Sequence, residues 1–187
     1  MSYKEPQIIR NFLTHEECDN LINFEKDKLK QSRVGKDART DLSYRNSLHK
    51  CHAMDSNKYV ASTMAKCSNI INIPLNYFEF IHIVKYDVGG FFRPHLDSVK
   101  GTNRVATFLL YLNDDYEGGE TRFPNLGKCY RLNKGDALFF HNYNKDLSET
   151  SLATHEGCVV TKGEKWIANV WVHKSPIPRS KPPHHVR

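Results

Sequence analysis

Three residues of this chain, His95, Asp97 and His155, have side chains that can together bind a transition metal. Because residues at i and i+2 of a β-strand project to the same face, His95 and Asp97 would present an imidazole and a carboxylate side by side. His155 would supply a second imidazole. Two histidines and one carboxylate form the facial triad that holds non-haem Fe(II) and leaves positions open for substrate and O₂. The pattern therefore predicts an open iron site.

A lysine distant from the first pair is the next candidate. Lys165 follows His155 by ten residues, with a predicted turn at Lys162–Glu164 between them. We expect this turn to place His155 and Lys165 on neighbouring antiparallel strands that face one cavity. A buried lysine is costly unless an anion pairs with it, and the distal carboxylate of a dicarboxylic cosubstrate would serve. The hydroxyls of Tyr86 and Thr121 are candidates to donate hydrogen bonds to the same carboxylate.

Each of these residues also has a purely structural interpretation. A His-x-Asp pair by itself is more often a hydrogen-bonded pair on a strand than a metal site. Lys165 can be a solvated residue at the end of a strand, and Tyr86 can be a strand tyrosine with its hydroxyl in water. The chemical interpretation gains its weight from all of these residues occurring together.

A β-rich scaffold is predicted from Pro74 onward, where β-branched and aromatic runs alternate with turn residues. Eight short strands at such spacing favour a sandwich or barrel of the jelly-roll type. The predicted strands are Tyr77–Tyr86, Phe91–Leu96, Arg104–Leu112, Glu120–Phe123, Lys128–Leu132, Asp136–His141, His155–Val160 and Lys165–His173.

The region before Pro74 has a helical pattern. Thr14-His15-Glu16-Glu17 fits a capping box and predicts a helix after Thr14, and Asp55–Ser68 predicts a second helix. Residues 31–50 are polar and aperiodic, which predicts a mobile segment with one strand near Arg45–Leu48. The fold class is thus mainly β with N-terminal helices. We expect one domain over 1–174, helical to about 73 and a jelly-roll core over about 74–174, followed by a disordered Pro-rich basic tail at 175–187.

Length, cysteine content and net charge indicate the class and the cellular location of the protein. The 187 residues fit one domain with a sizeable core, and no run of 18 apolar residues is present. The N-terminus lacks an apolar signal region, the five cysteines are odd in number, and no C-x-x-C pair occurs. These features predict an intracellular, cytoplasmic protein without a disulfide framework. The net charge of +6 is too small to argue for nucleic-acid binding, and the oligomeric state stays open.

The motifs jointly resemble the prolyl 4-hydroxylase family, over nearly the whole chain. The family comprises Fe(II)- and 2-oxoglutarate-dependent dioxygenases with a double-stranded β-helix. The segments that carry the resemblance are Tyr86–Asp97, Arg104–Thr107, Gly118–Pro124, His155–Cys158 and Gly163–Trp166, with Phe12–Ile22 similar to the family's first helix. The chain departs from the family at Phe92, where tyrosine is common.

The resemblance also implies roles for individual residues. His95, Asp97 and His155 would bind iron as the catalytic centre. Lys165 would pair with the C5 carboxylate of 2-oxoglutarate, assisted by Tyr86 and Thr121. O₂ would be the second cosubstrate and ascorbate a reductant. The two residues that would lie near a peptide substrate are Arg104 and Trp171.

The expected function is hydroxylation of a prolyl residue in a peptide or protein, with decarboxylation of 2-oxoglutarate to succinate and CO₂. One alternative keeps this chemistry and changes the substrate to a free amino acid, another side chain or a nucleic acid. The nucleic-acid demethylases of the superfamily usually anchor 2-oxoglutarate with arginine, whereas Lys165 occupies that position here. A further alternative is a catalytically silent binding module, which would predict a damaged triad.

Overall fold

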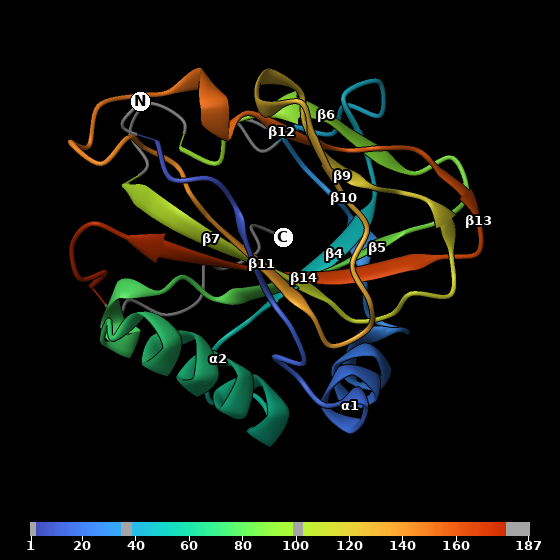
Figure 1. Ribbon diagram of the computed structural model, residues 1–187. Helices are drawn as coiled ribbons and strands as arrows, with labels where there is room; N and C mark the ends of the chain where they lie inside the picture. Colours follow the sequence, from blue (N-terminus) through green and yellow to red (C-terminus); the bar gives the residue numbers. More distant parts are fainter. Residues whose placement is uncertain (1–2, 35–38, 99–102, 179–187) are drawn as a thin grey trace.

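The structure is a computed structural model that describes residues 3–34, 39–98 and 103–178. Within these residues the chain forms a large and a small antiparallel sheet that face each other, and two helices pack on the outer side of the large sheet (Figure 1). This arrangement agrees with the predicted jelly roll. Side chains from both sheets line one pocket between them.

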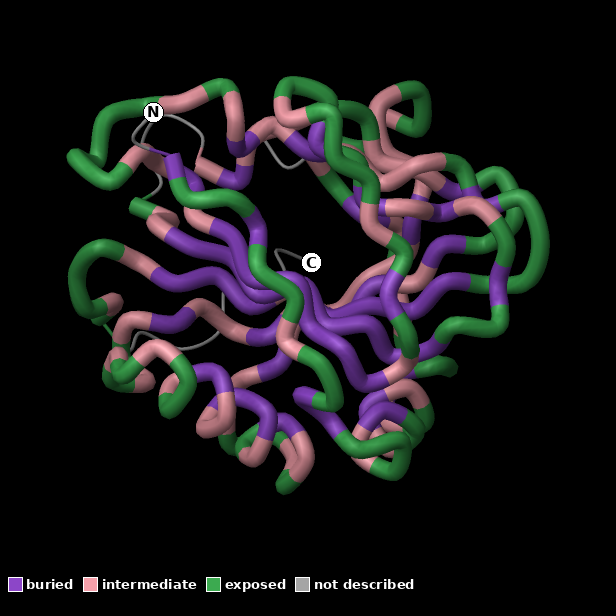
Figure 2. Tube along the Cα trace, viewed as in Figure 1, coloured by how far each residue is buried: buried purple, intermediate pink, exposed green. Residues whose placement is uncertain are grey.

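The large sheet has seven strands in the described chain. In sheet order these are β1 (Gln7–Ile9), β11 (Ala137–His141), β7 (Arg104–Tyr111), β14 (Lys165–His173), β5 (Ile81–Tyr86), β4 (Leu48–His52) and β2 (Lys30–Gln31). The long central strands are buried over most of their length, whereas the connecting loops are exposed (Figure 2).

The small sheet has five strands in the described residues, and a separate two-stranded pair completes the β-structure. The small sheet runs in the order β10 (Lys128–Tyr130), β9 (Thr121–Phe123), β12 (His155–Gly157), β6 (Phe91–His95) and β3 (Arg45–Asn46). The pair consists of β13 (Val160–Lys162) and β8 (Glu117–Gly118).

Most predicted strands are confirmed, with two differences. The run predicted at Tyr77–Tyr86 begins with a 3-10 turn at Leu75–Tyr77, so β5 starts only at Ile81. The run predicted at His155–Val160 is two strands, because the chain leaves the small sheet after β12 and β13 then pairs with β8.

The capping box predicted at Thr14 is confirmed. In α1 (His15–Glu25) the Thr14 hydroxyl accepts from the Glu17 amide at 3.2 Å, and the Glu17 carboxylate accepts from the Thr14 amide at 2.8 Å. The second helix, α2 (Lys58–Ile71), begins later than predicted because Asn57 is its N-cap and accepts from the Tyr59 amide at 2.7 Å.

Alternation along β14 separates two hydrophobic clusters. Trp166, Ala168 and Val170 point toward the helices and belong to the outer core. Ile167 belongs to the core between the sheets, and Lys165 lies on the same face as Ile167. Because successive residues of a strand alternate between faces, this register turns Lys165 into the space between the sheets.

The region before Pro74 contains short strands in addition to its two helices. β1, β2 and β4 extend the large sheet, and β3 extends the small one. β2 and β3 are polar, and they form because the sheet edges offer unpaired backbone groups as partners.

Parts of two other predictions fall outside the described residues. Of the segment 31–50, residues 35–38 lie outside. The described remainder contains the end of β2, and the one strand predicted near Arg45–Leu48 is two strands, β3 and the start of β4. Of the predicted tail, residues 179–187 lie outside. No helix within 3–34, 39–98 or 103–178 is long and apolar enough to cross a membrane.

Candidate active site

The three predicted metal ligands converge between the sheets. His95 ends β6 and His155 begins β12, and the two are directly opposite in the register of the small sheet. Asp97 follows β6, with its Oδ1 3.8 Å from His95 Nε2 and its Oδ2 3.8 Å from His155 Nε2. The three potential ligand atoms lie within 4.8 Å of one another. Their mutual proximity, predicted from sequence, is thus confirmed.

Backbone carbonyls orient both imidazoles. Nδ1 of His95 lies 2.8 Å from the Arg93 carbonyl oxygen, and Nδ1 of His155 lies 3.1 Å from the Ala153 carbonyl oxygen. Because a carbonyl oxygen can only accept, these contacts favour the tautomer with the hydrogen on Nδ1. Each Nε2 then presents its lone pair, which is the arrangement that outer-shell hydrogen bonds impose on metal-binding histidines.

A short hydrogen-bonded chain orients Asp97. The Thr107 hydroxyl donates to Asp97 Oδ2 at 2.7 Å, and the Asn142 amide donates to the Thr107 hydroxyl at 3.1 Å. Burial raises the pKa of Asp97, but the two imidazoles and the Thr107 hydroxyl together bring that pKa below its usual value. The carboxylate is therefore ionised.

The charge state of His95 also suits a metal ligand. Burial, followed by the nearby His155, lowers the pKa of His95 to about 3, so the imidazole is neutral near pH 7. Neutral imidazole and ionised carboxylate are the forms that coordinate metals. Two nitrogen donors and one oxygen donor on one side of a pocket fit Fe(II) with open coordination positions.

Lys165 lies in the same pocket and is almost completely buried, with 2% of its surface exposed. Its Nζ donates to the Gly119 carbonyl oxygen at 2.7 Å. Burial lowers the pKa of Lys165 to about 8. No ion pair between described residues includes Lys165, so its ammonium group lacks a carboxylate partner within residues 3–34, 39–98 and 103–178. A buried cation of this kind favours an anionic ligand.

The path of the chain between His155 and Lys165 differs from the prediction. We expected neighbouring antiparallel strands, but β12 belongs to the small sheet and β14 to the large one. The intervening β13 pairs with β8 and carries the chain across. The prediction of one shared cavity holds because the two side chains approach it from opposite walls.

Tyr86 and Thr121 line the same pocket as Lys165. Tyr86 is directly opposite Lys165 in the β5–β14 register. Thr121 accepts a hydrogen bond of 2.8 Å from the hydroxyl of Tyr111, a buried residue that the sequence did not single out. Because Tyr111 uses its hydrogen on Thr121, the Thr121 hydroxyl hydrogen can be donated elsewhere. Contact of these hydroxyls with a cosubstrate stays a prediction.

The two predicted substrate residues occupy different positions. Trp171 lines the pocket, and its buried Nε1 has no hydrogen-bond partner among the described residues. The guanidinium of Arg104 lies over the Trp171 ring, 3.8 Å from the centroid, and makes two hydrogen bonds of 2.7 and 2.8 Å to Glu79. Arg104 is not among the described residues that line the pocket, and it contacts the pocket through the Trp171 ring.

Several residues that line the pocket were not singled out from the sequence, among them Arg45 and Asn169. Arg45 lines it from β3, and its guanidinium lies 4.5 Å from the centroid of the Phe92 ring. No sequence signal could have found Arg45, because its segment has no periodicity. Asn169 also lines the pocket. Asn169 lies on β14, four residues after Lys165 and two before Trp171. This even spacing predicts that all three side chains share one face of the strand.

Comparison with known proteins places this geometry in context. Residues 81–173 match the family described as the 2OG-Fe(II) oxygenase superfamily. The chain is 35% identical to Prolyl 4-hydroxylase 13 of Arabidopsis thaliana, in an alignment that covers 87% of this chain and 68% of that protein. It is 30% identical to a putative prolyl 4-hydroxylase of Acanthamoeba polyphaga mimivirus, with coverage of 90% and 74%.

Solved structures show the same fold. The viral collagen prolyl hydroxylase of Paramecium Bursaria Chlorella virus-1, in its 2OG complex, superimposes with a TM-score of 0.74 at 28% identity over 90% of this chain and 96% of that one. A Pseudomonas putida prolyl-4-hydroxylase superimposes with a TM-score of 0.71 at 18% identity, over 90% and 92% of the two chains. The expected double-stranded β-helix is thereby confirmed.

Proposed function

The chain belongs to the 2OG-Fe(II) oxygenase superfamily as a prolyl 4-hydroxylase-like enzyme, and we propose that it hydroxylates a prolyl residue in a peptide or protein. Fe(II) and 2-oxoglutarate are implied by this membership. The observation that carries the proposal is the composition of one pocket, in which a His-Asp-His cluster from the small sheet faces the buried Lys165 from the large sheet.

The residues of the small sheet would hold the metal. His95, Asp97 and His155 offer three ligand atoms on one side, which leaves the opposite side for cosubstrate and O₂. When bound, iron supplies the activation of O₂ that couples decarboxylation of 2-oxoglutarate to hydroxylation of an unactivated C–H bond. The protein contributes ligand geometry in a pocket where Asp97, His155 and Lys165 are buried.

The residues of the large sheet would orient 2-oxoglutarate. Lys165 would neutralise the C5 carboxylate, and the hydroxyls of Tyr86 and Thr121 would donate to the same group. With its distal carboxylate fixed at Lys165, the cosubstrate would extend toward the triad on the facing wall. This arrangement would bring the reacting end of the cosubstrate to the metal and keep its anchored end away from it.

A prolyl substrate is favoured by the relatives and by the pocket walls. The curated relatives are named prolyl 4-hydroxylases, and Phe92 and Trp171 line this pocket with aromatic rings. An apolar pyrrolidine ring suits such walls. We further propose that ascorbate is the reductant. We also propose an intracellular location, which the five free cysteines support.

The decisive experiment supplies the full chain with Fe(II), 2-oxoglutarate, ascorbate and a set of proline-rich peptides. We expect a mass gain of about 16 Da, one inserted oxygen atom, that fragmentation assigns to proline. Peptides with each proline replaced by alanine, and reactions without 2-oxoglutarate, are the controls. Substrate-stimulated succinate release with the oxygen on a different residue type would keep the chemistry and contradict the prolyl assignment.

A further inference from the structure

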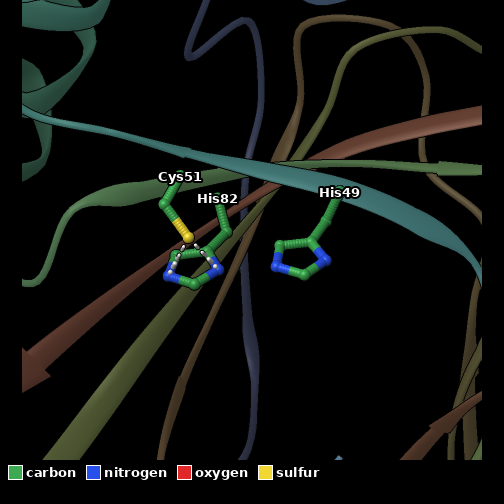
Figure 3. A group of neighbouring side chains, drawn as sticks. All are labelled: His49, Cys51 and His82. Atoms are coloured by element: carbon green, nitrogen blue, oxygen red, sulfur yellow. Dashed lines mark hydrogen bonds between the residues drawn. The ribbon is translucent and has the colours of Figure 1, made fainter. Parts of the chain in front are cut away.

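A second group of metal-ligating side chains lies outside the pocket described above. His49 and Cys51 project from β4, and His82 projects from the adjacent β5 (Figure 3). Each offers one ligand atom, and the three atoms lie within 4.8 Å of one another. None of these three residues is among the described residues that line the His95 pocket.

Sheet register explains why the three meet. Cys51 and His82 are directly opposite in the β4–β5 ladder, and His49 is two residues before Cys51 and therefore on the same face. The Cys51 sulfur lies 3.2 Å from each nitrogen of the His82 ring. The rings of His49 and His82 are nearly parallel, at 8°, with centroids 5.8 Å apart. The positions of the three residues are thus fixed by two adjacent strands, β4 and β5, of the large sheet.

From these contacts we propose that His49, Cys51 and His82 form a second metal site, of N₂S donor type, that takes Zn²⁺. The proposal is independent of the hydroxylase function. Zinc bonds of about 2.0–2.3 Å in a tetrahedral arrangement put ligand atoms roughly 3.3–3.6 Å apart. The sulfur-to-nitrogen distance of 3.2 Å is close to this spacing. Because the sulfur is equally far from both nitrogens of His82, that ring must rotate to direct one nitrogen lone pair at the metal.

The donor chemistry selects zinc over the iron of the first site. A thiolate with two imidazoles suits a borderline-soft ion such as Zn²⁺, whereas oxygen-rich sets suit harder cations. The first site offers a carboxylate in place of the thiolate, so the two clusters differ in softness within one chain. Three protein ligands would leave a fourth position for water.

Burial sets the charge states of two of the three ligand residues. Burial, followed by the neighbouring His49, lowers the pKa of His82 to about 3, so its ring is neutral and can act as a ligand. Burial raises the pKa of the Cys51 thiol to about 12, with Glu79 adding to this effect and Arg45 and Arg104 opposing it. Zinc binding would therefore displace a proton from the thiol to solvent.

The exposure of the three residues and their neighbouring contacts are consistent with a metal site. All three ligand residues are only half-buried. The Ser32 hydroxyl lies 3.1 Å from His49 Nδ1, which is the kind of outer-shell contact that orients a ligand ring. His82 also packs edge-on against Trp171, with centroids 4.6 Å apart.

Family membership does not by itself predict this site. The segment that matches the superfamily begins at residue 81, so His49 and Cys51 lie before it and only His82 lies within it. Two of the three ligand residues therefore lie outside the segment that matches the superfamily.

The first test uses Co²⁺ as a spectroscopic probe of the full chain, after removal of metals with a chelator under reducing conditions. We expect a thiolate-to-cobalt charge-transfer band that saturates at one equivalent and is bleached by Zn²⁺. Cys51→Ser should abolish the band. Cys129→Ser, at the exposed cysteine, is the matched control and should retain it. A folded parent without a thiolate band, or a band that survives in Cys51→Ser, overturns the proposal.

A second pair of variants covers folding and separates the two metal sites. His49→Gln, at a half-buried position, should weaken Zn²⁺ affinity by more than about 100-fold, beyond the loss of an outer-shell contact. His49→Gln provides the test if Cys51→Ser fails to fold. A Zn²⁺ affinity of His49→Gln equal to that of the parent would overturn the proposal. Asp97→Ala removes a ligand of the first site only and should keep the thiolate band. Loss of the band in a folded Asp97→Ala chain would show that the thiolate signal depends on the first site, against the proposal.

Discussion

Phe92 lies face to face with the imidazole of His95, with ring centroids 3.6 Å apart and an angle of 18° between the planes. The guanidinium of Arg45 lies over the Phe92 ring. His95 is therefore held by a ring contact in addition to its hydrogen bond with the Arg93 carbonyl. Since the family commonly has tyrosine at the position of Phe92, the phenyl ring can supply the stacking without the hydroxyl.

Removing this ring should weaken metal binding. Aromatic ring contacts are worth about 0.5–1.5 kcal/mol beyond burial, so Phe92→Ala should lower the affinity for a redox-inert divalent metal by up to about tenfold. Phe92→Tyr should keep parental affinity because it keeps the ring, and Phe91→Ala is the control on the neighbouring residue. Calorimetric titration measures all four proteins, and parental affinity in Phe92→Ala would contradict the orienting role.

Removing any one ligand of the triad should abolish turnover. A facial triad has no spare ligand, so alanine at His95, Asp97 or His155 should eliminate 2-oxoglutarate-dependent succinate release and the tight binding of Fe(II). Near-normal activity of any single variant without an added ligand would show that the metal is held elsewhere.

Removing the Lys165 ammonium should weaken cosubstrate binding while the metal ligands stay intact. Truncating one member of a buried charge pair costs roughly 2–5 kcal/mol. At about 1.4 kcal/mol per decade, even the lower value corresponds to a roughly 30-fold loss of 2-oxoglutarate affinity. Lys165→Arg should restore binding only in part, because a planar guanidinium does not replace a compact ammonium.

The measurement for Lys165 is calorimetric titration of 2-oxoglutarate into protein loaded with a redox-inert metal. Metal affinity in the same variants is the control. An affinity of Lys165→Ala within about twofold of the parent, far short of the loss for a broken charge pair, would make Lys165 a bystander.

Cosubstrate binding should also depend on pH through this lysine. Burial lowers the pKa of Lys165 to about 8 in the free protein, and only the protonated form attracts a carboxylate. The affinity for 2-oxoglutarate should therefore be full below about pH 8 and should fall as the pH rises above it. In Lys165→Arg this fall should be absent because arginine stays protonated. Equal pH profiles in the two proteins would contradict the assignment.

Acid stability should depend on Glu79. Burial raises the pKa of Glu79, but hydrogen bonds from His173 and Arg104 outweigh burial and bring it from 4.5 to about 2. A carboxylate with a lowered folded-state pKa contributes stability above its unfolded pKa. That contribution, about 3 kcal/mol, is lost as the pH falls from about 4.5 to about 2.

Urea unfolding at a series of pH values tests this expectation. Glu79→Gln should lower stability near pH 7 and show a smaller further loss in acid than the parent. Glu117→Gln is the control, because the Glu117–Lys162 pair is largely exposed and contributes little. Parallel acid profiles of the parent and Glu79→Gln would assign the acid sensitivity to other groups.

The sequence alone determined the local features of this protein. His95 and Asp97 lie close together as the sequence indicated, although Asp97 lies in a bend after β6 and not on the strand. The capping box at Thr14 and the strand runs after Pro74 follow from spacings of a few residues. Such spacings are read correctly because helix and strand periodicity fix which neighbours share a face. The joint occurrence of His95, Asp97, His155 and Lys165 then indicated an iron site with an anchor for a dicarboxylic cosubstrate.

Only the tertiary structure decided which distant residues meet. His155 and Lys165 reach one pocket from opposite sheets, and Arg45 joins them from a segment without periodicity. Likewise, Cys51 meets His82 only because β4 pairs with β5 in one particular register. Strand order and register depend on the burial of whole faces against each other, and no short stretch of sequence contains that information.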